Sequence, residues 1–173
     1  MVVVWLTGLP ASGKTTVGLE LKKKLESVNT AVVFLDGDDL RKTLSADLGF
    51  SRQDREMHAR RVLNLVQSLS EKGTWVIVAL ITPYRSSREM ARKQLRDYVE
   101  VWVKTSIAEC IKRDPKGLYK KAIGGQIRNF TGIHDPYEEP VNPELVIETE
   151  KFSPTECADM IISKLAALGY CKT

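Results

Sequence analysis

The sequence has few of the residues that build disulfide frameworks or zinc sites. Among its 173 residues are three cysteines and two histidines. Cys110, Cys157 and Cys171 are odd in number and widely spaced, and they form no C-x-x-C pair. This pattern excludes a disulfide scaffold and a cysteine-based zinc site. It favours a reducing compartment, and we therefore expect a cytoplasmic location.

Long hydrophobic runs and a strong net charge are also absent. The apolar run at the start reaches a glycine-containing loop within a few residues, so we expect neither a secretory signal nor a membrane span. With 26 Lys and Arg against 22 Asp and Glu, the net charge of +4 suits small anionic ligands but does not require nucleic acid. We expect a small-molecule substrate, with neither a membrane nor a nucleic acid as partner.

The length and composition fit one domain. A chain of 173 residues that is 43% hydrophobic can bury one core, and no repeat, linker or low-complexity tract interrupts it. We therefore expect a single domain over residues 1–173.

Short apolar runs alternate with helical patterns along the chain. After the run at residues 2–7, the runs at 31–35, 75–81, 99–103 and 145–149 have the length of strands. The continuous run at 31–35, AVVFL, is typical of a strand buried on both faces of a parallel sheet. Five strands alternating with helices predict an α/β fold with a mostly parallel five-stranded sheet and helices on both faces.

Capping signals mark several helix starts. Ser51 begins one capping box, and Ser153, followed by proline, begins another. Ser86 or Ser87 can cap the basic helix that follows, and Asp39 can cap a short helix over residues 40–48. Residues 114–143 are rich in glycine, proline and lysine and too long for an ordinary connection, so they form either a functional lid or a disordered segment.

The most specific motif lies between the first predicted strand and the next helix. The stretch GLPASGKTT fits G-x-x-x-x-G-K-[ST], with Gly8, Gly13, Lys14 and Thr15 at its defined positions. In this P-loop the backbone N–H groups surround phosphate oxygens, the lysine reaches the β- and γ-phosphates, and the hydroxyl binds Mg²⁺. The unpaired N–H groups at the start of the following helix add affinity for anions. The motif predicts a nucleoside triphosphate site, which GTPases, ATPases and small-molecule kinases share.

Acidic residues follow the second predicted strand in the sequence D-G-D-D. The carboxyl ends of strands form the ligand crevice of open α/β sheets, which makes Asp36 and Asp38 candidates for the acceptor side. One of them can hold Mg²⁺ or accept a hydroxyl proton while the other contacts the substrate. The alternative is that both acids only cap the next helix.

Arginines and loop phenylalanines supply further candidates. Arginine gives bidentate contacts to phosphate or sulfate, and Arg41 and Arg55 each lie within a turn of a loop that leaves the sheet. A solvated helix face is the alternative for each of them. Phe50 and Phe130 lie in predicted loops, where a ring either plugs the core or stacks on a planar ligand such as adenine.

A longer series of motifs resembles one family. LTGLPASGKTT, LDGDDLR, DLGFSRQDR, ITPYRSSR, RDPKGLYKKA, FTGIHDPYE and NPEL occur in the order and spacing of adenylylsulfate kinases. The resemblance implies a three-layer P-loop kinase fold with a lid at about residues 114–143, a homodimer, and ATP and Mg²⁺ as cofactors. It implies transfer of the γ-phosphoryl group of MgATP to the 3′-hydroxyl of adenosine 5′-phosphosulfate (APS). The products are 3′-phosphoadenosine 5′-phosphosulfate (PAPS) and ADP, and coupling to a separate ATP sulfurylase stays open.

The resemblance also assigns roles to residues. Lys14, Asp36 and Asp38 are implied as catalytic, with Thr15 and Asp36 on magnesium and Asp36 as base or metal carboxylate. The residues implied to hold ATP are Gly8, Leu9, Pro10, Ala11, Ser12, Gly13, Lys14, Thr15, Thr16, Cys110 and Arg113. Those implied to bind APS are Asp38, Arg41, Phe50, Arg55, His58, Ile81, Thr82, Lys116, Gly117, Leu118 and Phe130. Phe50 and Phe130 are implied to sandwich the APS adenine, and the lid to close over both nucleotides.

Several positions depart from the family pattern. Pro10 and Ala11 replace a usual Ser-Gly pair, and His58 replaces an asparagine that contacts the substrate, so retuned APS binding is expected. Thr82 replaces a serine considered a phosphorylated intermediate in some members. Direct transfer needs no protein nucleophile, so Thr82 is assigned a binding role. His134 replaces an aspartate, a change for which we have no physical account. Two other functions stay open: another small-molecule kinase, and a nucleotide-binding regulatory module that has lost turnover.

Overall fold

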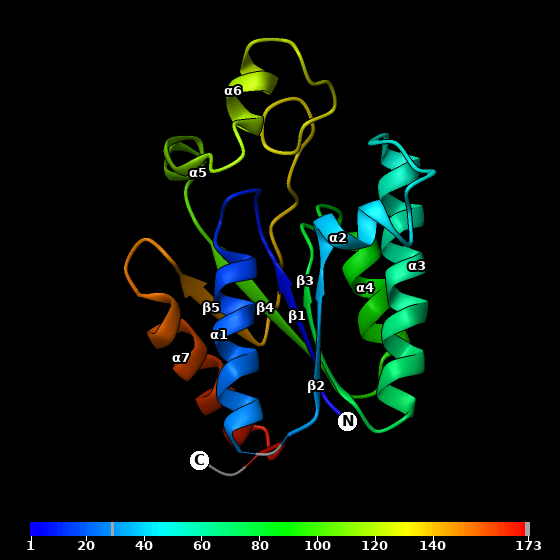
Figure 1. Cartoon of the computed structure of the whole chain (residues 1–173), viewed down its shortest axis with the longest axis vertical. Helices are drawn as coiled ribbons and strands as arrows, with labels where there is room; N and C mark the ends of the chain where they lie inside the picture. Colours follow the sequence, from blue (N-terminus) through cyan, green and yellow to red (C-terminus); the bar gives the residue numbers. More distant parts are fainter. Residues whose placement is uncertain (29, 172–173) are drawn as a thin grey trace.

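A parallel sheet forms the centre of the structure, a computed structural model that describes residues 1–28 and 30–171 (Figure 1). Its five strands are β1 (Val3–Thr7), β2 (Val32–Asp36), β3 (Trp75–Ala79), β4 (Tyr98–Lys104) and β5 (Leu145–Glu148). They lie in the order β2-β3-β1-β4-β5, and every neighbouring pair is parallel. The predicted α/β class is thereby confirmed.

Helices cover both faces of the sheet (Figure 1). α1 (Lys14–Ser27) and α7 (Pro154–Ala167) lie on one face, and α3 (Arg52–Glu71) and α4 (Arg85–Gln94) lie on the other. Alternate residues of β1 point to opposite faces, so Val4 and Leu6 join the core under α1 while Val3 and Trp5 join the core under α3. Among the described residues no helix is long and apolar enough to cross a membrane.

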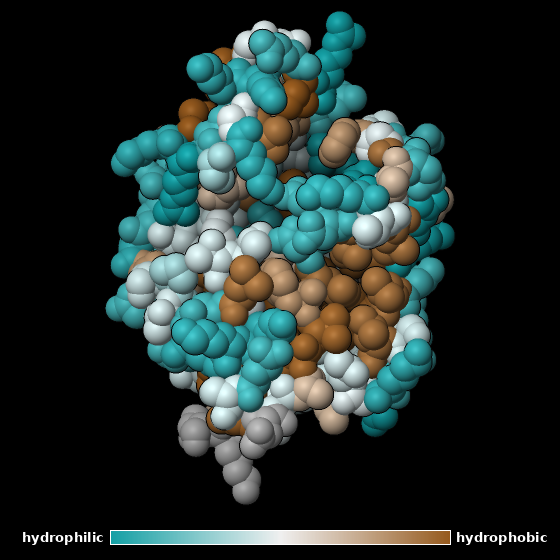
Figure 2. All heavy atoms as spheres, in the orientation of Figure 1, coloured by the Kyte–Doolittle hydropathy of each residue, from teal (hydrophilic) through white to brown (hydrophobic). Residues whose placement is uncertain are grey.

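Strand β2 lies at one edge of the sheet. All five of its residues are half-buried, whereas those of β1 and β3 are buried. The prediction that the run at 31–35 is buried on both faces is therefore wrong, because a continuous apolar run fits an edge strand as well as a central one. Figure 2 shows apolar side chains gathered over this strand, between α1 and α3.

The helix starts confirm some capping predictions and correct others. α3 and α7 each begin with the predicted capping box. α4 begins at Arg85, before the two serines expected to cap it, and Tyr84 is its N-cap. The short helix expected over 40–48 is α2 (Gly37–Lys42), and its cap is Asp36, while Asp39 lies inside the helix. A cap depends on where the chain leaves the sheet, and β2 ends one turn earlier than the sequence pattern indicated.

Residues 114–143 stand above the carboxyl edge of the sheet, after α5 (Ile107–Arg113) (Figure 1). They contain α6 (Leu118–Ile123) and form a small core of their own. In it the rings of Tyr119 and Phe130 meet edge to face, with centroids 4.9 Å apart, beside the buried Cys110. Of the two alternatives for this segment, the structure therefore favours the ordered one, and its action as a lid stays a prediction.

Candidate active site

A cavity of about 970 Å³ opens at the carboxyl edge of the sheet. The ends of β1, β2 and β3 meet at this edge, which is where open α/β sheets bind ligands. Most of the predicted site residues line the cavity: Pro10, Ala11, Gly13, Lys14, Thr15, Thr16, Asp36, Asp38, Arg41, Phe50, Arg55, His58, Ile81, Thr82, Arg113, Lys116, Leu118 and Phe130.

The other predicted residues, Gly8, Leu9, Ser12, Cys110 and Gly117, are not part of the cavity lining. Gly8 is needed for close packing, because a Cβ there would lie 2.5 Å from the carbonyl oxygen of Val103. Cys110 is fully buried in the small core with Tyr119, and burial raises the pKa of its thiol. Cys110 therefore packs behind the cavity wall in the described structure.

The P-loop holds a buried cation beside unpaired backbone N–H groups. Gly13, with φ of 99°, precedes α1, and no side chain in the described part of the chain caps that helix. The Lys14 ammonium donates hydrogen bonds to the carbonyl oxygens of Gly8, at 2.9 Å, and Leu9, at 2.6 Å. Burial lowers the pKa of Lys14 to about 8. The loop therefore presents a desolvated positive charge and the positive end of a helix to an incoming anion.

Thr15 and Asp36 form the pair predicted to hold magnesium. The Thr15 hydroxyl donates to Oδ2 of Asp36 at 2.7 Å, and Oδ1 of Asp36 accepts the backbone N–H of Asp38 at 2.9 Å. Asp36 therefore caps α2 and faces the P-loop at once. Hydroxyl and carboxylate oxygens fit Mg²⁺, which prefers oxygen ligands and keeps positions for water and phosphate. The described residues contain no group of three or more His, Cys, Asp or Glu that could hold a metal ion. Further ligands must therefore come from the nucleotide and water.

Two arginines and Phe50 form a cluster on the other side of the cavity. The guanidinium carbons of Arg41 and Arg55 lie 5.0 and 5.6 Å from the centre of the Phe50 ring. Arg55 is only 8% exposed and donates to the carbonyl oxygens of Phe50, at 3.1 Å, and Asn129, at 2.6 Å. It therefore ties α3 to the loops that carry Phe50 and Phe130. Phe50 itself is 55% exposed, so its ring does not plug the core.

Comparison with known proteins decides the family. The family model for adenylylsulphate kinase matches residues 1–148. The chain belongs to the adenylylsulfate kinase family. It is 47% identical over 167 residues to a probable adenylyl-sulfate kinase of Pyrococcus abyssi, with 96% of each chain covered. It is 44% identical over 169 residues to the adenylyl-sulfate kinase of a Synechococcus strain, covering 98% of this chain and 96% of the relative.

A solved adenylylsulfate kinase has the same fold. The Mycobacterium tuberculosis APS kinase CysC, in complex with AMPPNP and APS, superposes with a TM-score of 0.92 at 41% identity. The match covers 95% of this chain and 97% of that one. The predicted family, the P-loop kinase fold, kinase function and ATP as phosphoryl donor are thereby confirmed.

Two departures from the adenylylsulfate kinase pattern occupy left-handed backbone conformations. Ala11 has φ of 61° and Thr82 has φ of 42°, a region that costs a β-branched residue free energy. The Thr82 hydroxyl accepts a hydrogen bond from the Trp5 indole at 2.9 Å, and its carbonyl accepts one from Arg88. Thr82 is 2% exposed, so its hydroxyl is engaged within the core.

The third departure, His58, is buried and 3% exposed. Its Nδ1 lies 2.9 Å from the hydroxyl of Ser45, and its Nε2 has no hydrogen-bond partner among the described residues. Burial, with the nearby charges of Arg41, Arg61 and Arg55, lowers the pKa of His58 to about 4. The ring is therefore neutral near pH 7.

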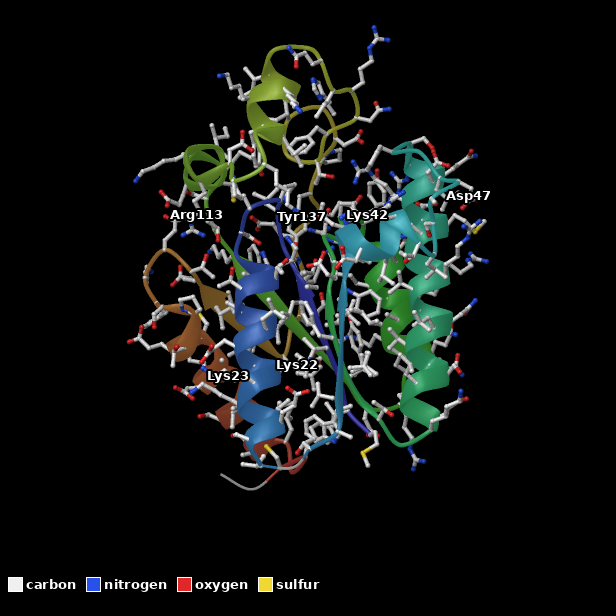
Figure 3. The ribbon with its side chains drawn as sticks, in the orientation of Figure 1. Lys22, Lys23, Lys42, Asp47, Arg113 and Tyr137 are labelled. Carbon is white, nitrogen blue, oxygen red and sulfur yellow. The ribbon has the colours of Figure 1, made fainter. Side chains whose placement is uncertain are left out.

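The structure adds residues that sequence reasoning missed. Arg113, at the end of α5 (Figure 3), donates to the hydroxyl and carbonyl oxygens of Thr149, each at 2.9 Å, and Thr149 donates to the carbonyl of Ser12 at 2.8 Å. Thr149 thus joins the P-loop to the Arg113 side of the cavity. Thr131 also lines the cavity. The position of Thr149 directly after a predicted strand was a usable signal, whereas Thr131 belongs to an irregular segment with no periodic pattern.

Proposed function

We propose that this chain transfers the γ-phosphoryl group of MgATP to the 3′-hydroxyl of APS, giving PAPS and ADP. The observation that carries the proposal is that one cavity joins a P-loop to the cluster of Arg41, Phe50 and Arg55. The P-loop suits a triphosphate donor, and two arginines beside an exposed aromatic ring suit an anionic nucleotide as acceptor. The relative solved with AMPPNP and APS supports the same pair of ligands.

On the donor side, Lys14 and the first N–H groups of α1 bind the phosphates. Lys14 exchanges the carbonyl oxygens of Gly8 and Leu9 for phosphate oxygens and neutralises the charge of the transferred group. Thr15 and Asp36 hold Mg²⁺, which supplies further charge neutralisation when bound. Arg113, held by Thr149, lies on the side of the cavity that we assign to the ATP base.

On the acceptor side, the two carboxylates take different roles. Both oxygens of Asp36 are engaged, by Thr15 and by the start of α2, which suits a fixed metal ligand. Asp38 is exposed and lies one turn further along the cavity rim, where we assign it to accept the proton of the acceptor hydroxyl. Arg41 and Arg55 bind the phosphosulfate, and Phe50 and Phe130 stack on the adenine.

The lid contacts the acceptor side directly. Lys116, which precedes α6, forms an ion pair with Asp38 of α2. This pair joins the lid segment to the candidate base, although both side chains are more than half exposed, so it adds little stability. We propose that residues 114–143 close over both nucleotides and exclude water, which would compete as phosphoryl acceptor.

The test is release of ADP from MgATP with and without APS, with PAPS identified by mass spectrometry. APS-dependent ADP release at one PAPS per ADP supports the proposal. Asp36→Asn abolishes it, while the matched variant Asp39→Asn, an exposed residue of the same helix, retains it. ADP release that APS does not stimulate, but that another alcohol in a panel of nucleotides and sugar acids does, points to a different small-molecule kinase. Binding of both nucleotides without any product points to a regulatory module.

We also propose a cytoplasmic homodimer. The three cysteines are free thiols in the described structure, which fits a reducing compartment. The edge strand β2 carries half-buried apolar residues and unpaired backbone groups along its outer side, a surface suited to a second copy of the chain (Figure 2). Light scattering after gel filtration tests the dimer, and a mass of 19.4 kDa would contradict it.

A further inference from the structure

Ser45 and His58 form a buried polar pair behind the acceptor side of the cavity. Ser45 is 0% exposed and follows α2, while His58 lies on α3 and lines the cavity. The Ser45 hydroxyl oxygen and Nδ1 of His58 are 2.9 Å apart. Because both side chains are buried, their hydrogen bond is not exchanged with water and holds the imidazole in one orientation.

The second ring nitrogen of His58 has no such partner. Nε2 is buried and makes no hydrogen bond within the described residues. A buried polar atom without a partner is disfavoured in a folded protein, and those that persist often await a ligand. His58 adjoins the site of Arg41 and Arg55, and all three side chains line the same cavity.

We propose that Ser45 is a positioning residue for APS binding: its hydroxyl donates to Nδ1 of His58, which places the ring proton on Nε2 and presents an N–H donor to APS. The inference rests on the proposed function. A hydroxyl is both donor and acceptor, so the pair by itself permits either tautomer. The surroundings decide in favour of the donor form, because Arg41 and Arg55 make this part of the cavity suited to anionic oxygens, and these accept hydrogen bonds.

The charged groups around His58 keep it in this neutral form. Arg41, Arg61 and Arg55 are near it, and together with burial they hold its pKa well below neutrality. His58 therefore acts as a fixed neutral donor, in contrast to the arginines beside it. Ser45 contributes through the orientation of the ring and makes no contact with APS itself.

Nitrogen NMR of the free protein tests the tautomer without any activity. The chain has only two histidines, so His134→Gln assigns the spectrum. A long-range ¹H–¹⁵N correlation spectrum of wild type at pH 7 shows His58 with its proton on Nε2, and Ser45→Ala gives a mixture of tautomers. A wild-type ring with its proton on Nδ1, or a tautomer unaffected by Ser45→Ala, overturns the proposal. This measurement stands even if the proposed function fails.

Steady-state kinetics test the consequence. Ser45→Ala raises KM for APS roughly 5- to 10-fold, the effect of one lost or misaligned hydrogen bond, while kcat and KM for ATP change less than about twofold. The matched variant Ser87→Ala, a buried serine outside the cavity, leaves KM for APS unchanged. Equal increases in both KM values indicate a merely structural role and overturn the proposal.

A double-mutant cycle closes the argument. His58→Ala raises KM for APS, and in that background Ser45→Ala adds nothing, because no ring is left to position. Thermal unfolding of each variant identifies any loss of fold. A further rise in KM for APS from Ser45→Ala in the His58→Ala protein, with unfolding unchanged, shows that Ser45 acts without the ring and overturns the proposal. If wild type releases no ADP with APS, the proposed function fails, and the NMR result still decides the tautomer.

Discussion

The buried charge of Lys14 makes the stability of the free protein depend on pH. The ammonium is 8% exposed and burial lowers its pKa from 10.5 to about 8. Below pH 8 the folded and unfolded chains both carry the proton, so stability does not change. Between pH 8 and 10.5 the folded chain has lost a proton that the unfolded chain still binds, so the free energy of unfolding rises with pH.

The size of this effect follows from the pKa shift. Each pKa unit corresponds to about 1.4 kcal/mol, so the full shift amounts to roughly 3 kcal/mol. By pH 9.5 about 2 kcal/mol of it is expressed. Lys14→Met keeps a side chain of similar length without the charge. The unfolding free energy of wild type, relative to Lys14→Met, therefore increases by about 2 kcal/mol between pH 7 and pH 9.5.

Urea unfolding of both proteins at the two pH values measures this difference. The other titrating groups occur in both proteins and cancel. A constant difference contradicts the reasoning. A difference that falls with pH shows that the hydrogen bonds from Lys14 to Gly8 and Leu9 outweigh its desolvation. Saturating MgATP should flatten the dependence, because the phosphates raise the pKa of Lys14 again.

Three further predictions concern residues in unusual or bridging positions. Ala11→Gly relieves a left-handed alanine and raises the unfolding free energy by about 1 kcal/mol, measured in urea; no gain would mean that the conformation carries no cost. Thr82→Val leaves the Trp5 N–H without an acceptor and lowers the unfolding free energy by about 1–3 kcal/mol, while Thr82→Ser restores it and kcat is kept in both; loss of turnover in the valine variant alone would instead support a phosphorylated intermediate. Arg55→Lys keeps the charge but loses the fork that ties the two loops, so KM for APS rises about 10- to 100-fold with KM for ATP unchanged; equal KM values for APS in wild type and variant would refute the bridging role.

Much of the fold and of the donor half of the site could be predicted from sequence. The P-loop is local, because Gly13, Lys14 and Thr15 are adjacent in the chain and their geometry follows from a strand, a tight turn and a helix start. The capping box at Ser51 is equally local. The acceptor half was predicted only through the resemblance of motifs, since Arg41, Arg55 and Phe130 come from separate elements.

The sequence by itself determined the alternation of strands and helices, the phosphate-binding loop and the family. Tertiary structure alone decided that β2 is an edge strand, that Asp36 rather than Asp39 caps α2, and that the Thr82 hydroxyl is taken by Trp5. It also decided that Ser45 faces His58. The physical reason is range: periodicity and capping act over a few residues, whereas these contacts join residues up to 77 positions apart, which only the packed sheet and helices bring together.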